Sequence, residues 1–123
     1  MAKKKILVIE DEVDLVKAMQ IRLEQAGYDV ISSNDGKNGL DKAKQEGPDL
    51  IILDLMLPKM DGYKVCGLLK ADSRYNKIPV IMATARAQES DSKLGFEVGA
   101  DAYIVKPFQY EVLLEKIKVL LKE

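Results

Sequence analysis

Four short apolar runs, each followed directly by an acidic or polar residue, are the feature that most constrains the fold of this chain. The runs cover residues 6–9, 50–53, 80–83 and 103–105. They are apolar throughout and rich in β-branched residues, which is typical of parallel strands buried on both faces of a sheet. The residues that follow these runs are Glu10, Asp11, Asp54, Thr84 and Lys106.

The polar residues after the runs are expected to lie close together. If the strands are parallel neighbours, these residues meet at the carboxyl edge of the sheet, where open α/β sheets bind ligands. Three carboxylates, a hydroxyl and an ammonium group then share one small volume. Because hard oxygen ligands suit divalent cations, the pattern indicates a site for a divalent cation and a phosphoryl group.

Helix-like stretches alternate with the strands. Apolar residues recur at helical spacing over 13–26, and Gly27 follows as a helix stop. Further helices are predicted over 36–45, 62–71, 91–98 and 110–121. A weaker strand is predicted over 28–32, and the fourth and fifth strands over 79–83 and 102–105. The inner face of the last helix is expected to hold Val112, Leu113, Ile117, Leu120 and Leu121. The alternation predicts one α/β domain over residues 1–123, a doubly wound, five-stranded parallel (βα)5 sheet.

The composition limits the classes of function. With a formal net charge of −1, no basic excess exists to neutralise phosphates, so direct nucleic-acid binding is not expected. The absence of histidine excludes histidine bases and histidine metal ligands, and the single cysteine, Cys66, excludes an intramolecular disulfide. No apolar run reaches the ~20 residues that span a bilayer, and no signal peptide is recognised before residue 6. A soluble, cytoplasmic protein without membrane contact is expected.

Four sequence strings carry a resemblance to a known family. They are ILVIEDE (6–12), DLIILDLMLPKMDG (49–62), PVIMATA (79–85) and GADAYIVKPF (99–108). Each is weak alone, but in this order and spacing they resemble the receiver domain of two-component response regulators, over residue 6 to about 121. The resemblance implies the flavodoxin-like strand order 2-1-3-4-5. It also implies a signalling domain that catalyses only its own phosphorylation and dephosphorylation, not an enzyme with a separate substrate.

The resemblance implies an acceptor and a metal site. Asp54 is the implied phosphorylation site, because a carboxylate can attack a phosphoryl donor to form an aspartyl phosphate. Mg²⁺, with Mn²⁺ as an alternative, is implied to bind Asp11, Asp54 and the backbone carbonyl of Met56, with Glu10 acting directly or through water. Without metal the carboxylates repel one another, so the pKa of at least one should rise and metal affinity should weaken as the pH falls.

The remaining positions are implied to stabilise and report the phosphoryl group. Lys106 is expected to pair with Asp54 at rest and with a phosphoryl oxygen afterwards, and Thr84 to donate its hydroxyl to another. Tyr103 corresponds to the second switch position, its ring moving inward as Thr84 shifts. The surface that responds would comprise the fourth helix, fifth strand and fifth helix, and Phe108 and Tyr110 are expected to add exposed aromatic rings near it.

The implied partners are proteins. The donor would be a phosphohistidine on a sensor histidine kinase or histidine phosphotransfer protein, or a small acyl phosphate, and the receiver would control a downstream protein or output domain. Ala102, Lys116 and Lys118 depart from the acid and arginines of the branch that dimerises through charge pairs. A monomer or a weak, phosphorylation-dependent dimer is therefore expected. A single-domain receiver is favoured, and a receiver cut from a longer protein stays open.

Three alternatives share parts of the pattern. A phosphatase of the haloacid-dehalogenase type needs a second Asp two residues after its nucleophile, where this chain has Met56. A flavodoxin-like cofactor binder needs a phosphate loop after the first strand, where Glu10 and Asp11 would repel phosphate. A degenerate receiver used only for docking would lack acceptor-site residues, which are all present here.

Overall fold

The computed structural model describes residues 3–85 and 99–123. Its parallel sheet has the order β2-β1-β3-β4-β5, as the resemblance implies. The strands are β1 (Lys5–Ile9), β2 (Asp29–Ser33), β3 (Leu50–Leu53), β4 (Val80–Thr84) and β5 (Ala102–Val105). The expected doubly wound α/β fold is therefore confirmed.

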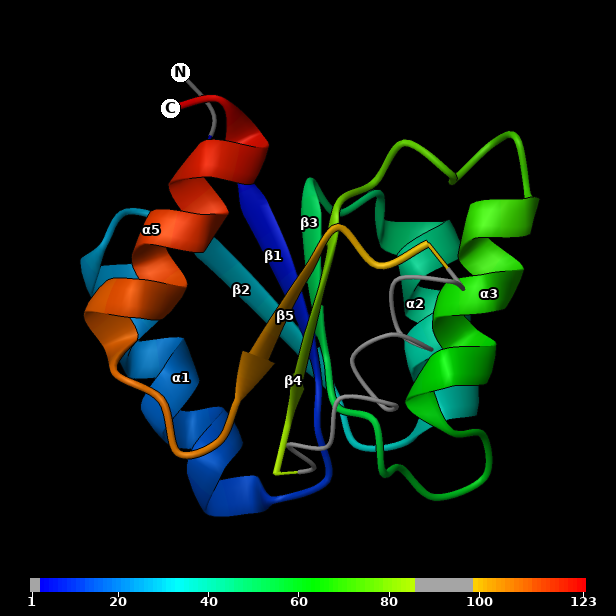
Figure 1. The fold of residues 1–123 in the computed structure, drawn as a ribbon, viewed down its shortest axis with the longest axis horizontal. Helices are drawn as coiled ribbons and strands as arrows, with labels where there is room; N and C mark the ends of the chain where they lie inside the picture. Colours follow the sequence, from blue (N-terminus) through cyan, green and yellow to red (C-terminus); the bar gives the residue numbers. More distant parts are fainter. Residues whose placement is uncertain (1–2, 86–98) are drawn as a thin grey trace.

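Helices cover both faces of the sheet. On one face lie α1 (Val13–Gln25) and α5 (Tyr110–Leu121), and on the other α2 (Gly36–Glu46) and α3 (Gly62–Ala71) (Figure 1). The strands β3 and β5 and the helices α3 and α5 begin and end at the expected residues, and the other described elements differ by one residue at one or both ends. The expected helix over 91–98 lies outside the described residues.

Local chemistry explains where the helices begin. Asp35 caps α2 by accepting a hydrogen bond from the Asn38 amide at 2.7 Å, and Asp61 caps α3 in the same way through the Lys64 amide at 2.9 Å. These caps set the first turn of each helix at the edge of the sheet where the strands end. That placement fixes the loops around the candidate site.

The central strands are buried on both faces, which separates the core into two layers. Alternate residues of β1 and β3 face α1 and α5, and the intervening residues face α2 and α3. The layer on the α2 and α3 side includes Cys66, whose side chain is fully buried. The continuous apolar runs of the sequence are thus explained by helices on both sides.

Some apolar positions of the helices face solvent rather than the core. Val112 was expected on the inner face of α5, but it is 43 % exposed, and Val13 and Ile21 of α1 are also exposed. Phe108 and Tyr110 were expected to be exposed, yet both are half-buried and pack against the core layer beside α1 and α5. Arg22 of α1 covers the Tyr110 ring at 4.6 Å from its centroid, which helps explain that burial.

The carboxyl end of α5 is held near the amino ends of the strands, on the side of the sheet opposite the candidate site. Tyr28, just before β2, is buried and donates its phenolic hydrogen to Glu123 Oε1 at 2.7 Å. Burial and this carboxylate raise the pKa of Tyr28 to about 12. The hydrogen bond therefore holds residue 123 beside the start of β2.

Candidate functional site

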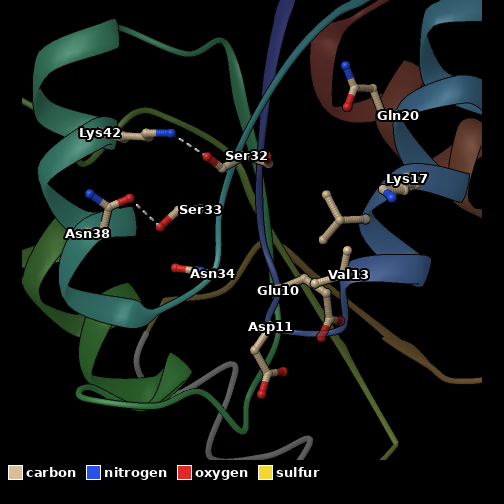
Figure 2. A pocket seen from close by; sticks show the side chains of 11 residues that line it. Glu10, Asp11, Val13, Lys17, Gln20, Ser32, Ser33, Asn34, Asn38 and Lys42 are labelled. Carbon is tan, nitrogen blue, oxygen red and sulfur yellow. Dashed lines mark hydrogen bonds between the residues drawn. The ribbon is translucent and has the colours of Figure 1, made fainter.

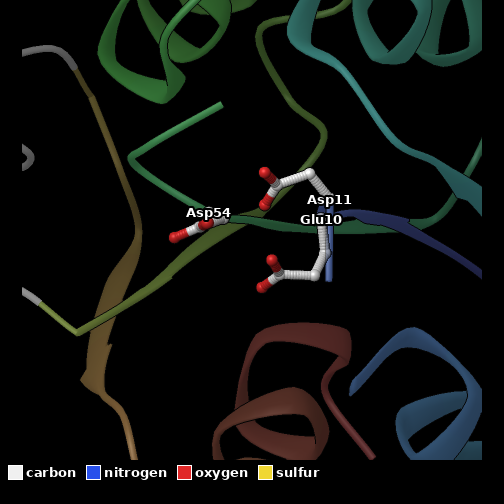
Figure 3. A group of neighbouring side chains, drawn as sticks. All are labelled: Glu10, Asp11 and Asp54. Atoms are coloured by element: carbon white, nitrogen blue, oxygen red, sulfur yellow. The ribbon is translucent and has the colours of Figure 1, made fainter. Parts of the chain in front are cut away.

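The register of the sheet brings the predicted acids together. Ile9 of β1 is paired with Leu53 of β3, so Glu10 and Asp54, which follow them, leave the sheet at the same level. Asp11 follows Glu10, and Figure 3 shows the three side chains converging at this edge. The three acids of the predicted cluster therefore lie together at the carboxyl ends of the strands.

The three carboxylates lie close enough together to bind one metal ion. One oxygen from each of Glu10, Asp11 and Asp54 lies within 4.8 Å of the others. Glu10 and Asp54 are buried and Asp11 is exposed, so the cluster opens to solvent on the side of Asp11. Because oxygen ligands in such an arrangement suit Mg²⁺, the residues present fit this ion.

The backbone after Asp54 adds to the site. The amides of Leu55 and Met56 donate hydrogen bonds to the Asp54 carboxylate, which fixes its orientation and places the Met56 backbone beside it. The Met56 side chain is 62 % exposed, so it does not fill the cluster. This is compatible with a role for its carbonyl, rather than its side chain, as a metal ligand.

The ammonium group of Lys106 lies among the acids, but its closest partner differs from the expected one. Lys106 Nζ donates a hydrogen bond to Glu10 Oε1 and lies 3.7 Å from Asp54 Oδ1. The side chain of Glu10 is longer than that of an aspartate, so its carboxylate extends far enough to accept the hydrogen bond from Lys106. The expected resting pair of Lys106 and Asp54 is therefore secondary to the pair with Glu10.

The pKa values of both buried acids are raised. For Glu10 the main cause is burial, opposed by the hydrogen bond from Lys106, and the charge of Asp54 raises it further. Burial is also the largest cause for Asp54, opposed first by Lys106 and then by the Met56 amide. The rise was expected from repulsion between carboxylates, but loss of hydration is the larger effect.

Thr84 and Tyr103 lie on the neighbouring strands β4 and β5. Thr84 is the last residue of β4 and is buried, and Lys106 donates its backbone amide to the Thr84 carbonyl at 2.8 Å. Tyr103 of β5 is paired with Met82, two residues before Thr84, and is half-buried against the core layer beside α2 and α3. Both side chains therefore project from the same face of the sheet.

Two features of the site were not identified from the sequence. The Glu12 amide donates to Glu10 Oε2 at 3.2 Å, giving the buried carboxylate a second partner. Gly62 begins α3 so close to β3 that a Cβ there would lie 2.3 Å from the Asp54 carbonyl oxygen. The glycine directly after the helix cap Asp61 was the available signal for this close approach.

A cleft of about 420 Å³ adjoins the acids at the carboxyl ends of β1 and β2, and residues of both α1 and α2 line it. Figure 2 shows Glu10 and Asp11 at one end and polar groups of β2 and α2 at the other. Lys42 donates to the Ser32 carbonyl, and the Ser33 hydroxyl lies 2.7 Å from Asn38 Oδ1, so these polar groups satisfy one another.

Comparison with known proteins identifies the family. Over 119 residues the chain is 46 % identical to the alkaline phosphatase synthesis transcriptional regulatory protein PhoP of Bacillus subtilis, covering 97 % of this chain and 49 % of PhoP. The chemotaxis protein CheY4 of Vibrio cholerae is similar in structure, with a TM-score of 0.90 at 31 % identity, covering 97 % of this chain and 99 % of CheY4.

A third similar protein is the receiver domain of the sensor histidine kinase PA1611 of Pseudomonas aeruginosa, solved with magnesium in its active-site cleft. Its TM-score is 0.91 at 27 % identity, covering 99 % of this chain and all of that domain.

The extent of the matches defines what is shared. The chain spans about half the length of the curated relatives it matches, which include the transcriptional regulators PhoP and RpaA. No helix among the described residues is both long and apolar enough to cross a bilayer. A family model for the response regulator receiver domain matches residues 6–118. The chain therefore belongs to the receiver domain family of two-component response regulators.

Proposed function

We propose that this receiver accepts a phosphoryl group on Asp54 in a Mg²⁺-dependent reaction. The observation that carries the proposal is the convergence of Glu10, Asp11 and Asp54, with an oxygen of each within 4.8 Å of the others, beside the ammonium of Lys106. Phosphoryl transfer needs mainly placement and charge neutralisation, and this cluster supplies both. The similar receiver domain of PA1611, which holds magnesium in its cleft, supports the choice of ion.

The proposed reaction forms one bond and breaks one. An oxygen of the Asp54 carboxylate attacks the phosphorus, and the bond from phosphorus to the donor's imidazole nitrogen breaks with its electron pair returning to that nitrogen. The Leu55 and Met56 amides hold the carboxylate in position for attack. When bound by Asp11, Asp54, the Met56 carbonyl and, directly or through water, Glu10, Mg²⁺ would neutralise negative charge on the phosphoryl oxygens.

Two side chains are proposed to stabilise the product and start the switch. Lys106 would move from Glu10 toward a phosphoryl oxygen, a short shift because its ammonium is already 3.7 Å from Asp54 Oδ1. Thr84 would donate its hydroxyl to a second oxygen, and Tyr103, on the same face of the sheet, would respond to that movement. These contacts exist only with the phosphoryl group present, so they bias a conformational equilibrium.

The proposed partners are a phosphohistidine donor and a protein that receives the signal. The donor is a sensor histidine kinase or histidine phosphotransfer protein. Because the chain matches about half of regulators such as PhoP, the output is proposed to be a downstream partner or an attached domain. The receiver itself is proposed to act as a monomer or weak, phosphorylation-dependent dimer, without contacting nucleic acid.

Acetyl phosphate tests the assignment directly. Incubation with Mg²⁺ should add one phosphoryl group to the wild type, detected by intact mass, and Asp54→Ala should add none. Asp49→Ala is a matched control, since Asp49 lies at the amino ends of the strands, away from the acids, and accepts a hydrogen bond from the Lys5 amide. No adduct on the wild type would favour a receiver used only for docking, and an adduct on Asp54→Ala would place the acceptor elsewhere.

A further inference from the structure

The start of α2 lies directly against the loop that follows Asp54. The Gly36 amide donates to the Pro58 carbonyl at 3.2 Å, and a Cβ at Gly36 would lie 1.8 Å from the Met60 carbonyl oxygen. Real Cβ contacts are never this short, and the clashing atoms belong to backbone, so neither side could yield by a side-chain rotation. Only glycine permits this approach.

The loop over residues 55–61 is held at both ends. At its start the Met56 amide donates to the Asp54 carboxylate, and at its end the Gly62 amide donates to the Leu55 carbonyl at 2.8 Å. Between them, Lys59 has a φ of 67°, the left-handed region that side chains rarely occupy. The contact with Gly36 therefore supports the part of the loop that is locally least favourable.

The helix side of this contact cannot easily move. Asp35 caps α2 through the Asn38 amide, and Gly39, one turn later, packs so closely on Ile9 of β1 that a Cβ would lie 2.6 Å from its side chain. A side chain added at Gly36 would consequently displace the loop rather than the helix.

We infer that Gly36 is a positioning residue for the metal site, acting through the loop that carries Met56. This inference rests on the proposed function, in which the Met56 carbonyl binds Mg²⁺. The Gly36 amide donates to Pro58 and not to any of the three acids, so its contribution is to set the distance between the loop and the acids. Residues behind metal ligands commonly change metal affinity 10- to 100-fold when replaced.

The test measures Mg²⁺ binding to unphosphorylated protein by titration calorimetry. Gly36→Ala should weaken Mg²⁺ affinity by about tenfold or more. Gly47→Ala is the control: it lies at the other end of α2, has a φ of 59°, and has no atom within 4 Å of an added Cβ. That variant should lose folding stability through backbone strain and keep the wild-type affinity.

Phosphorylation by acetyl phosphate gives a second readout. In Gly36→Ala the Mg²⁺ concentration for half-maximal rate should rise by about tenfold, while the rate at saturating Mg²⁺ stays close to that of the wild type. If Gly36→Ala does not fold, Pro58→Gly replaces it, because loosening the loop backbone should lower the affinity for the same reason.

The outcomes separate the inference from the proposed function. Wild-type affinity in folded Gly36→Ala, or in Pro58→Gly where the first variant does not fold, would overturn the positioning role. A loss of affinity in Gly47→Ala equal to that in Gly36→Ala would overturn it as well, since the effect would then be general. Absence of Mg²⁺ binding to the wild type would instead refute the proposed metal site.

Discussion

Lys106 Nζ lies 3.7 Å from Asp54 Oδ1 while donating a hydrogen bond to Glu10. One cation thus serves two buried carboxylates, and all three side chains are largely shielded from water. Partners in such an arrangement depend on one another, because an unpaired buried charge is costly.

Lys106→Met should destabilise the metal-free protein. Removing one member of a buried charge group leaves the others uncompensated, and the expected loss at pH 7 is about 3 kcal/mol. Lys59→Met is the matched control, since Lys59 is 69 % exposed and pairs with Asp35 only at 3.8 Å, and it should cost less than about 1 kcal/mol. Urea unfolding in the presence of a chelator compares them, and equal losses would contradict the argument.

Asp54→Asn should alter the pH dependence of stability. Burial raises the pKa of Asp54 above its ordinary 3.8, so the folded protein binds this proton more tightly than the unfolded chain does. The stabilisation that comes from protonating Asp54 is then fully present below pH 3.8, and it is lost as the pH rises through the raised pKa. Without metal, the free energy of unfolding of the wild type should therefore fall relative to that of Asp54→Asn as the pH rises above 3.8. If the difference in unfolding free energy between the two proteins stays constant with pH, or if the wild type gains stability relative to Asp54→Asn as the pH rises, this linkage is excluded.

Mg²⁺ should stabilise the fold, and Asp11→Asn should remove most of that effect. At a Mg²⁺ concentration ten times its dissociation constant, the expected gain for the wild type is about 1.4 kcal/mol. Since protons compete for Glu10 and Asp54, whose pKa values are raised, the gain should shrink as the pH falls. Thermal unfolding with and without Mg²⁺ measures this gain in stability. The control is Asp49→Asn, at the amino ends of the strands, which should retain the full gain. A gain that persists in Asp11→Asn would move the metal away from this cluster.

Cys66 should be inert in the folded protein. Its side chain is fully buried, and burial raises the pKa of the thiol to about 11. Both effects suppress the thiolate that reacts with disulfide reagents. Labelling should therefore follow the rate of unfolding, increase steeply in urea, and be absent in Cys66→Ala. Rapid labelling in native buffer would show that the core around α3 opens locally.

The sequence predicted the parts of the molecule that depend on local chemistry. The bounds of β3 and α3 could be predicted because Gly47 and Pro48 stand just before the strand and the capping Asp61 directly precedes the helix. The cluster of Glu10 and Asp54 was also predictable, since parallel register alone brings strand ends together.

Features that depend on three-dimensional packing were missed. The exposure of Val112 depends on how α5 is rotated about its axis, and apolar spacing leaves that rotation uncertain by one residue. The choice of Glu10 over Asp54 by Lys106 depends on side-chain reach across the edge. The contact of Gly36 with Met60 joins residues from separate elements, and no local pattern marks it.

The attachment of Glu123 to Tyr28 has a practical consequence for anyone who wishes to tether this domain. The polypeptide leaves α5 beside the start of β2, whereas Asp54 follows the far end of β3 (Figure 1). A fluorescent tag or sensor chip coupled through residue 123 would therefore stand on the side of the molecule remote from the reacting carboxylate, leaving incoming donors unobstructed.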